Sequence, residues 1–196
     1  MKKTLSNSNI ALIAIIGALS GLLMLIKFPI AIAPSFYKLD VSDLPALIGS
    51  LSLGPIPALF IQIIKIIVKC VLDPTKTGYV GELAAFLFSS VYCIIASIIY
   101  KLNRSKKGAY IAIIVSSMLM VIFACICNYY FLIEAYANAF NTTLPKIIEL
   151  GQMIFPIINT KLDFVLCCVA PFNAIKAIIC DVLTILLYKR ISPILK

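Results

Sequence analysis

Long apolar runs without a charged side chain are the feature that most limits what this chain can fold into. Four such runs cover residues 9–26, 44–64, 83–100 and 108–133, and two charge-bearing apolar runs cover residues 58–72 and 164–188. Because about 20 apolar residues are enough for a helix to cross a bilayer, these runs predict membrane-spanning helices. Hydrophobic residues make up 62% of the 196 residues and charged residues only 13%, which excludes an ordinary soluble domain.

The number of spans depends on residues 44–72, which are too many for one crossing and few for two. Two prolines within Gly54-Pro55-Ile56-Pro57 favour a turn inside this stretch. The positions of the charges then decide between five and six spans, because an excess of Lys and Arg marks cytoplasmic loops. With six spans the cytoplasmic side carries only basic residues, namely Lys2, Lys3, Lys101, Arg104, Lys106, Lys107, Lys189, Arg190 and Lys196. Most of the acids then lie outside, namely Asp40, Asp43, Asp73, Glu82, Glu134, Glu149 and Asp163. We therefore predict an all-α membrane protein, one domain over residues 1–196, with six transmembrane helices in a bundle and both termini cytoplasmic.

The chain lacks the residues that most catalytic and metal sites require. It has seven cysteines but no histidine and no Cys-x-x-Cys pair, so the usual zinc and proton-shuttle arrangements are excluded. It also has no Gly-x-x-x-x-Gly-Lys-Ser/Thr loop for nucleotide phosphates. The net charge of +9 comes from basic residues at the ends of apolar runs, which indicates membrane topology and not nucleic-acid binding. We predict a protein that is not an enzyme, with no metal and no cofactor.

A lysine within the last apolar run is the strongest candidate for ligand binding. Lys176 would cost roughly 2.5–3.5 kcal/mol to insert at mid-membrane, so it needs a functional explanation. Asn173 lies three positions earlier, about 60° around a helix, and therefore points the same way. Pairing of Lys176 with Asp181 is poorly placed, because five residues correspond to about 140° of rotation. On this basis Lys176→Met is expected to weaken the binding of a polar solute while leaving folding unharmed.

Other polar residues within the apolar runs have both structural and functional interpretations. Lys69 can pair with Asp73 near the outer surface, and Lys65 can meet a neighbouring helix or take part in a site. Asn128, followed by two tyrosines, is either a ligand contact or part of an interfacial aromatic belt. Thr77 can cap the following helix, in which Glu82 suits the first turn.

Two outer segments are expected to be structured. Residues 28–42 contain prolines and aromatic residues, including Phe36 and Tyr37, and suit a loop folded over the mouth of the bundle. Residues 134–163 form a long connection that contains an amphipathic stretch, 144–154, expected as a surface helix. In the first apolar run, small residues at Ala14 and Ala18 and at Gly17 and Gly21 permit close helix approach within the bundle or to a partner.

Several motifs together resemble a known family. They are FYKLDVSDLPALIG at 36–49, Gly-Pro at 54–55, TGYVGELA at 77–84 and PFNAIK at 171–176. They resemble the substrate-binding S components of energy-coupling-factor (ECF) vitamin transporters, and most of all the riboflavin-specific members. The resemblance runs over nearly the whole chain. It implies a six-helix bundle with an outward-facing flavin pocket, and a coupling subunit and two cytoplasmic ATPases supplied by other chains.

The same resemblance implies which residues contact ligand and partner. The implied substrate-binding set comprises Phe36, Tyr37, Leu39, Glu82, Asn128, Asn173 and Lys176. Ala14 and Ala18 match the family's contact with the transmembrane coupling subunit. The predicted function is high-affinity capture of riboflavin for ATP-driven uptake by a multi-pass protein of the cell membrane. Two alternatives stay open: the same architecture serving thiamin, biotin or a queuosine precursor, and a membrane scaffold or sensor that transports nothing.

Overall fold

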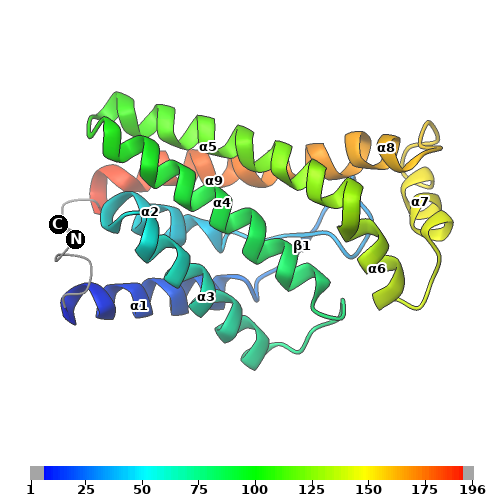
Figure 1. The fold of residues 1–196 in the computed structure, drawn as a ribbon, viewed down its shortest axis with the longest axis horizontal. Coiled ribbons are helices and arrows are strands. Elements are labelled where there is room, and N and C mark those ends of the chain that lie inside the picture. The colour runs from blue at the N-terminus through cyan, green and yellow to red at the C-terminus, as the bar shows by residue number, and fades with distance from the viewer. Residues whose placement is uncertain (1–6, 192–196) are drawn as a thin grey trace.

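A computed structural model describes residues 7–191, which fold into a long bundle of helices with one short β hairpin (Figure 1). The first helices are α1 (Asn7–Leu23), α2 (Asp43–Leu53), α3 (Pro55–Leu72), α4 (Val80–Leu102) and α5 (Lys106–Cys127). The later helices are α6 (Ile133–Ala139), α7 (Leu144–Gln152), α8 (Lys161–Phe164) and α9 (Ala170–Ile191). Two π-helical turns, η1 (Asn128–Leu132) and η2 (Val165–Val169), join α5 to α6 and α8 to α9. The hairpin pairs β1 (Phe28–Pro29) with β2 (Lys38–Leu39) in antiparallel register.

The predicted turn between the second and third apolar helices is confirmed. Gly54 separates α2 from α3 with a φ of 104°, a conformation that glycine adopts without steric cost. Pro55 then occupies the first turn of α3, where its missing N–H costs no intrahelical hydrogen bond. The outcome is a short α2 of 11 residues, about 17 Å long, beside an α3 of 18 residues.

Four segments of the described chain are long and apolar enough to cross a membrane. They are Pro55–Leu72, Val80–Leu102, Lys106–Ala139 and Lys161–Leu187. α1 and α2 are also apolar but shorter. The start of α1 and the end of α9 lie at the same end of the bundle (Figure 1). The chain ends themselves, residues 1–6 and 192–196, lie outside the described residues, so the predicted position of the termini stays a prediction.

α2 lies at the centre of the bundle, in contact with α1, α3, α4 and α9. Its side chains from Ala46 to Leu51 are all buried. α1 packs closely on α3, because a Cβ on Gly17 would come within 2.7 Å of Ile64 and one on Gly21 within 2.6 Å of Val68. The glycine pair thus serves the bundle itself.

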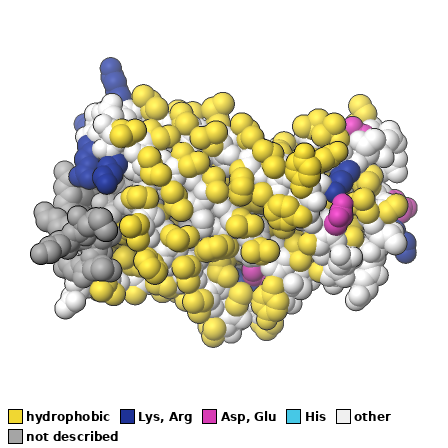
Figure 2. Space-filling model, in the orientation of Figure 1, with side chains coloured by type: hydrophobic (Ala, Val, Ile, Leu, Met, Phe, Trp, Pro, Cys, Tyr) yellow, Lys and Arg dark blue, Asp and Glu magenta, His cyan; other side chains and the backbone are white. Residues whose placement is uncertain are grey.

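Hydrophobic side chains cover the middle of the molecular surface. Figure 2 shows them across the central band of one face, with Lys and Arg side chains gathered at the left end. The α4–α5 connection lies at that end, and its basic residues Lys101, Arg104, Lys106 and Lys107 are all exposed. Acidic side chains appear in the right half of the same view. Such a band between polar ends matches the apolar interior of a bilayer.

The long connection over residues 134–163 is structured as predicted. The amphipathic stretch forms α7, which packs on α6 and α8 at the end of the bundle opposite the start of α1 (Figure 1). α8 then begins with a capping box, in which the Thr160 side chain accepts from the Asp163 N–H and the Asp163 carboxylate accepts from the Thr160 N–H. This cap fixes the direction in which the chain enters α8, η2 and α9.

Candidate ligand-binding site

A cavity of about 1050 Å³ lies between the hairpin segment, α2, α3, α4, α6, α7 and α9. A cavity of this size can hold a drug-sized ligand. Its lining includes five of the seven predicted substrate-binding residues, namely Phe36, Tyr37, Glu82, Asn173 and Lys176. The structure therefore brings together residues from the hairpin, from α4 and from the last helix, which are far apart in the sequence.

Aromatic rings form one wall of the cavity. The ring of Phe36 lies with its centroid 4.7 Å from Tyr37, 4.9 Å from Tyr136 and 5.5 Å from Phe140. Tyr37 also lies 5.1 Å from the ring of Phe172 on α9. Tilted ring pairs at these separations are stabilising, and together they hold the hairpin segment against α6 and α9. The cavity therefore has an apolar wall made of tilted aromatic rings, which a ring-containing ligand can contact.

Asn128 and Leu39, the other two predicted residues, do not line this cavity. Asn128 is buried in η1, where its side-chain oxygen accepts a 2.8 Å hydrogen bond from the Tyr37 hydroxyl. Its Nδ2 donates to the Ala124 carbonyl at 2.8 Å, so both ends of the amide have partners within the protein. Burial raises the pKa of the Tyr37 phenol well above its usual value, so the hydroxyl stays protonated and donates. Asn128 thus holds the aromatic wall in place.

Leu39 has a similar supporting place. It lies opposite Phe28 in the hairpin and packs, half-buried, on the hydrophobic cluster that contains Tyr37. Because successive side chains of a strand point to opposite faces, Leu39 and its neighbour Lys38 cannot both face the ligand. Lys38 is the one that lines the cavity.

Four charged residues form an inner cluster beside the aromatic wall: Asp40, Asp43, Lys65 and Lys176. Lys176 Nζ lies 3.1 Å from Asp40 Oδ2 and 3.2 Å from Asp43 Oδ2. The other oxygen of Asp43 accepts a 2.7 Å hydrogen bond from Lys65 Nζ. The side-chain exposure of all four lies between 0% and 12%. Two lysines and two aspartates thus alternate in a buried chain whose formal charge is zero.

This cluster corrects one expectation from the sequence. Asp40 and Asp43 were expected in an outer loop as topology markers, but both are buried in the bundle. They form ion pairs with Lys176, for which the sequence indicated no partner. Asp181 indeed does not pair with Lys176, since it accepts a hydrogen bond from Tyr92. The physical reason is that the segment before α2 folds inward, so that charges otherwise costly in an apolar bundle neutralise one another.

Asn173 completes this end of the cavity. Its Nδ2 donates to the Val169 carbonyl at 2.9 Å, one turn earlier on the same helix. The bond fixes the amide group, and its oxygen stays free to accept from a ligand. Asn173 and Lys176 both line the cavity, as their spacing predicts. Together they offer one acceptor and one charged donor.

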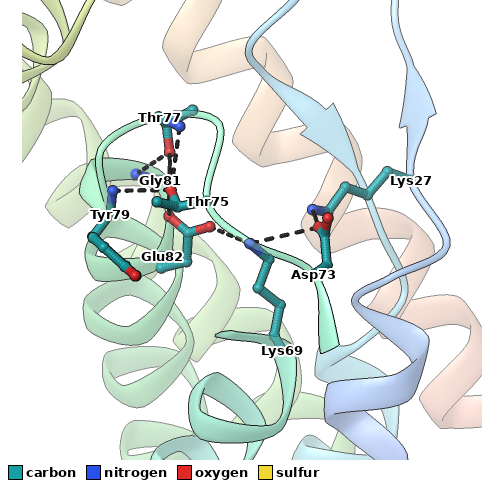
Figure 3. Close-up of polar contacts among 8 residues, drawn as sticks. All are labelled: Lys27, Lys69, Asp73, Thr75, Thr77, Tyr79, Gly81 and Glu82. Carbon is teal, nitrogen blue, oxygen red and sulfur yellow. Dashed lines mark hydrogen bonds and ion pairs between the residues drawn. The ribbon is translucent and has the colours of Figure 1, made fainter. Parts of the chain in front are cut away.

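A second set of four charged residues, the outer cluster, lies along another wall: Lys27, Lys69, Asp73 and Glu82 (Figure 3). Lys69 hydrogen-bonds to Glu82 and also lies 3.6 Å from Asp73, the partner predicted for it. Asp73 Oδ2 accepts a 2.8 Å hydrogen bond from Lys27 at the base of the hairpin. That bond, more than any other interaction, holds the pKa of Asp73 below its usual value.

The connection before α4 is tied to this outer cluster. Thr75 and Thr77 donate to Glu82 Oε2 at 3.0 Å and 3.2 Å (Figure 3). Thr77 also accepts from the Gly81 N–H at 3.1 Å, so it satisfies a free donor of the first helical turn as predicted. Glu82, predicted in the first turn of this helix, is there, and its side chain is 6% exposed and paired with Lys69.

Several cavity residues were not predicted from the sequence. Phe172 lies in an apolar run, and Tyr136 and Phe140 lie in the long connection 134–163. In both places the sequence gives no signal that separates an aromatic ligand wall from ordinary packing. Asp40 and Asp43 did carry a signal. Two acids three positions apart, directly before an apolar helix, match the two lysines that lie within apolar helices, but only folding shows which charges meet.

Comparison with known proteins places the chain in a family. The family described as "ECF transporter, substrate-specific component" matches residues 8–188. The chain therefore belongs to the family of ECF transporter substrate-specific components, which are parts of transporters and not enzymes. Among the described residues no group of His, Cys, Asp or Glu could hold a metal ion.

Individual relatives carry more specific names. The chain is 30% identical to the riboflavin transporter RibU of Staphylococcus aureus, over 97% of this chain and 93% of that protein. It is 24% identical to the riboflavin transporter FmnP of Bacillus subtilis, over 94% and 92% respectively. A solved structure described as the S component of a bacterial ECF transporter superposes with a TM-score of 0.75 at 28% identity. That superposition covers 97% of this chain and 98% of the other.

Proposed function

We propose that this chain captures riboflavin from outside the cell for ATP-driven uptake. The observation that carries the proposal is the cavity, which has an aromatic wall on one side and Asn173 and Lys176 on another. Riboflavin has a flat apolar ring system, a polar uracil-like edge and a hydroxylated side chain. The rings suit the Phe36 wall, and the polar edge suits the amide and the ammonium group. The names of the relatives in Staphylococcus and Bacillus support the same ligand.

The charges of the two clusters are also compatible with a neutral ligand. The inner cluster holds two lysines and two aspartates, so its formal charge is zero, and the outer cluster is balanced in the same way. A neutral ligand needs no counter-ion and gains from a few well-placed hydrogen bonds in an otherwise apolar site. In this arrangement Lys176 donates to the ligand while staying paired. Asn128 and Leu39 support the wall, and Glu82 anchors the outer side of the cavity.

The membrane arrangement follows from the same proposal. We infer six membrane-embedded helical segments in the plasma membrane, with α1 and α2 completing the four long spans, and both termini cytoplasmic. The exposed basic residues of the α4–α5 connection then face the cytoplasm. This orientation puts the cavity, the hairpin and α7 on the outer side, where the vitamin arrives.

Ala14 and Ala18 are proposed to contact the transmembrane coupling subunit, which works with two cytoplasmic ATPases. Ala14 is exposed on α1 and Ala18 half-buried, whereas Gly17 and Gly21 are buried against α3. The two small-residue pairs therefore lie on different faces of one helix, and only the alanine pair is open to another protein. Ala14→Leu is expected to reduce uptake while leaving riboflavin binding by the isolated chain unchanged.

Riboflavin titration of the purified chain tests the function. Because the chain has no tryptophan, flavin fluorescence is the natural signal, and binding is expected to quench it. Thermal unfolding gives a second readout, since ligand at about 100 times Kd stabilises the native state by about 2.7 kcal/mol. Thiamin and biotin serve as comparison ligands. Stabilisation by either of these, with no response to riboflavin, would contradict the proposal.

A further inference from the structure

Lys65 is a buried charge that the proposed function leaves without a role. Its side chain on α3 has 0% exposure, and it is not among the residues that line the cavity. Its Nζ donates to Asp43 Oδ1 at 2.7 Å and to Ser89 Oγ at 3.0 Å. Burying an ammonium group is costly even when it is paired, so stability alone is a weak explanation for it.

The partner of Lys65 is shared with Lys176. Asp43 gives one oxygen to Lys65 and lies with the other 3.2 Å from the Lys176 ammonium. Asp40 holds Lys176 from a second side at 3.1 Å, and its own Oδ1 accepts from the Ser42 N–H at 3.0 Å. Lys176 is therefore attracted by two carboxylates, of which Asp43 is neutralised by another lysine and Asp40 is not.

An ammonium group has three donors, and this limits what Lys176 can give to a ligand. Asp40 accepts one of them at 3.1 Å and Asp43 lies 3.2 Å away, so few donors are left for the cavity. Lys65 and Lys176 share the carboxylate of Asp43. Because Lys65 neutralises part of its negative charge, Asp43 attracts Lys176 less strongly than it would alone. Lys65 thus acts on the ligand-facing lysine through one intervening group.

We propose that Lys65 is a positioning residue for ligand binding. By compensating Asp43 it keeps Lys176 directed toward the cavity with a donor available. Without Lys65 the uncompensated carboxylate of Asp43 draws Lys176 away from the ligand. The inference rests on the proposed function, in which Lys176 contacts riboflavin. A merely structural Lys65 would instead fix α2 to α3 and leave the affinity of the folded protein unchanged.

Two variants separate these roles: Lys65→Met alone, and Lys65→Met combined with Asp43→Asn. In Lys65→Met we expect riboflavin affinity to fall by about tenfold or more, because a hydrogen bond to a charged group is lost or weakened. In the combined variant the excess negative charge is gone, and the amide oxygen that replaces the carboxylate can still accept from Lys176. Its affinity is expected to return to within about fivefold of the wild type, since coupled residues do not contribute additively.

One control variant tests whether losing any paired lysine weakens binding, and thermal unfolding tests whether each variant is folded. Lys161→Met removes an ion-paired lysine outside the cavity, next to Glu134, and is expected to bind riboflavin like the wild type. Thermal unfolding of each variant identifies those that are folded. If Lys65→Met does not fold, Lys65→Gln takes its place, because it also removes the charge that compensates Asp43 and is expected to lose affinity in the same way.

Two results would overturn the proposal. One is wild-type affinity in folded Lys65→Met; the other is a combined variant that is folded but binds at least about tenfold more weakly than the wild type. Failure of the proposed function looks different, since the wild-type chain itself would then not respond to riboflavin in the same titration.

Discussion

The inner and outer clusters contain the same charges in different surroundings. Each has two lysines and two carboxylates around one cavity. In the inner cluster every side chain is at most 12% exposed, whereas in the outer cluster Lys27 and Asp73 are 27% and 31% exposed. Because charge interactions strengthen as water is excluded, the same pairings are worth more inside and are less sensitive to salt. From this comparison we expect burial, and not the number of ion pairs, to decide how much each pair contributes to stability.

Lys69 and Glu82 lie between these extremes. Their side chains are 2% and 8% exposed, although they belong to the outer cluster. The outer cluster thus has a buried pair, which joins α3 to α4, and an exposed pair, which joins the hairpin base to the end of α3. If burial controls the strength of these pairs, the stability lost on substitution should follow the exposure of the side chain and not the cluster to which it belongs.

The largest effect is expected for Lys176→Met. It leaves two buried carboxylates with only Lys65 as a partner, and breaking a buried pair from one side costs about 3–5 kcal/mol of unfolding free energy. The substitution is therefore not as harmless to folding as the sequence suggested. Riboflavin affinity should fall by roughly 1.5–3 kcal/mol as the donor is lost. Thermal unfolding and flavin titration measure the two effects separately. Unchanged stability would show that the inner cluster is not the tight network described here.

Lys69→Met is expected to come next. It leaves Glu82 buried with only the hydroxyl groups of Thr75 and Thr77, at a cost of about 2–3 kcal/mol in unfolding free energy. The double variant Lys69→Met with Glu82→Gln removes both charges and should recover most of that loss. If the single variant is no less stable than Lys27→Met, burial does not rank the pairs and the comparison fails.

The hydrogen bond between Tyr37 and Asn128 involves no charge, so the stability lost with it can be compared with the losses for the charged pairs. Asn128→Ala removes the acceptor for the Tyr37 hydroxyl, which should lower stability by about 1 kcal/mol and loosen the aromatic wall. Because Asn128 acts through Tyr37, Tyr37→Phe should cause a similar loss of riboflavin affinity, and the two changes together should add little. Fully additive losses of affinity would indicate that Asn128 contacts the ligand itself.

The smallest effect is expected for Lys27→Met, about 0.5 kcal/mol, because this pair is partly exposed. The substitution should also change how the free energy of unfolding depends on pH. The pKa of Asp73 is held below its usual value, so the pair's contribution is complete above about pH 4 and is lost as the pH falls through the lowered value. Unfolding measured from neutral to acidic pH should therefore show less acid sensitivity in Lys27→Met. An equal acid dependence in both proteins would argue against this pair.

Much of the fold followed from local patterns. The apolar runs, the Gly54-Pro55 break and the amphipathic stretch of α7 predicted helices and a turn that the structure confirms, because hydrophobic length and proline chemistry act within one segment. The Asn173 and Lys176 pair was predicted for the same reason, since helical spacing alone puts both on one face. The short length of α2 was harder to predict from the sequence. Its 11 residues are too few for a lone membrane span, but other helices surround it in the bundle.

What the sequence determined by itself is the class of protein: an apolar helical chain, its motifs, and the face of α9 that meets the cavity. Only the tertiary structure decided which charges pair. Asp40, Asp43 and Glu82 were placed on the outer side of the membrane, because a local pattern assigns charges to water. In the fold, lysines from α3 and α9 offer each of them a partner, and a charge that finds its counter-ion inside the bundle no longer has to reach the solvent. That choice depends on contacts between residues as far apart as Asp40 and Lys176, which no local pattern contains.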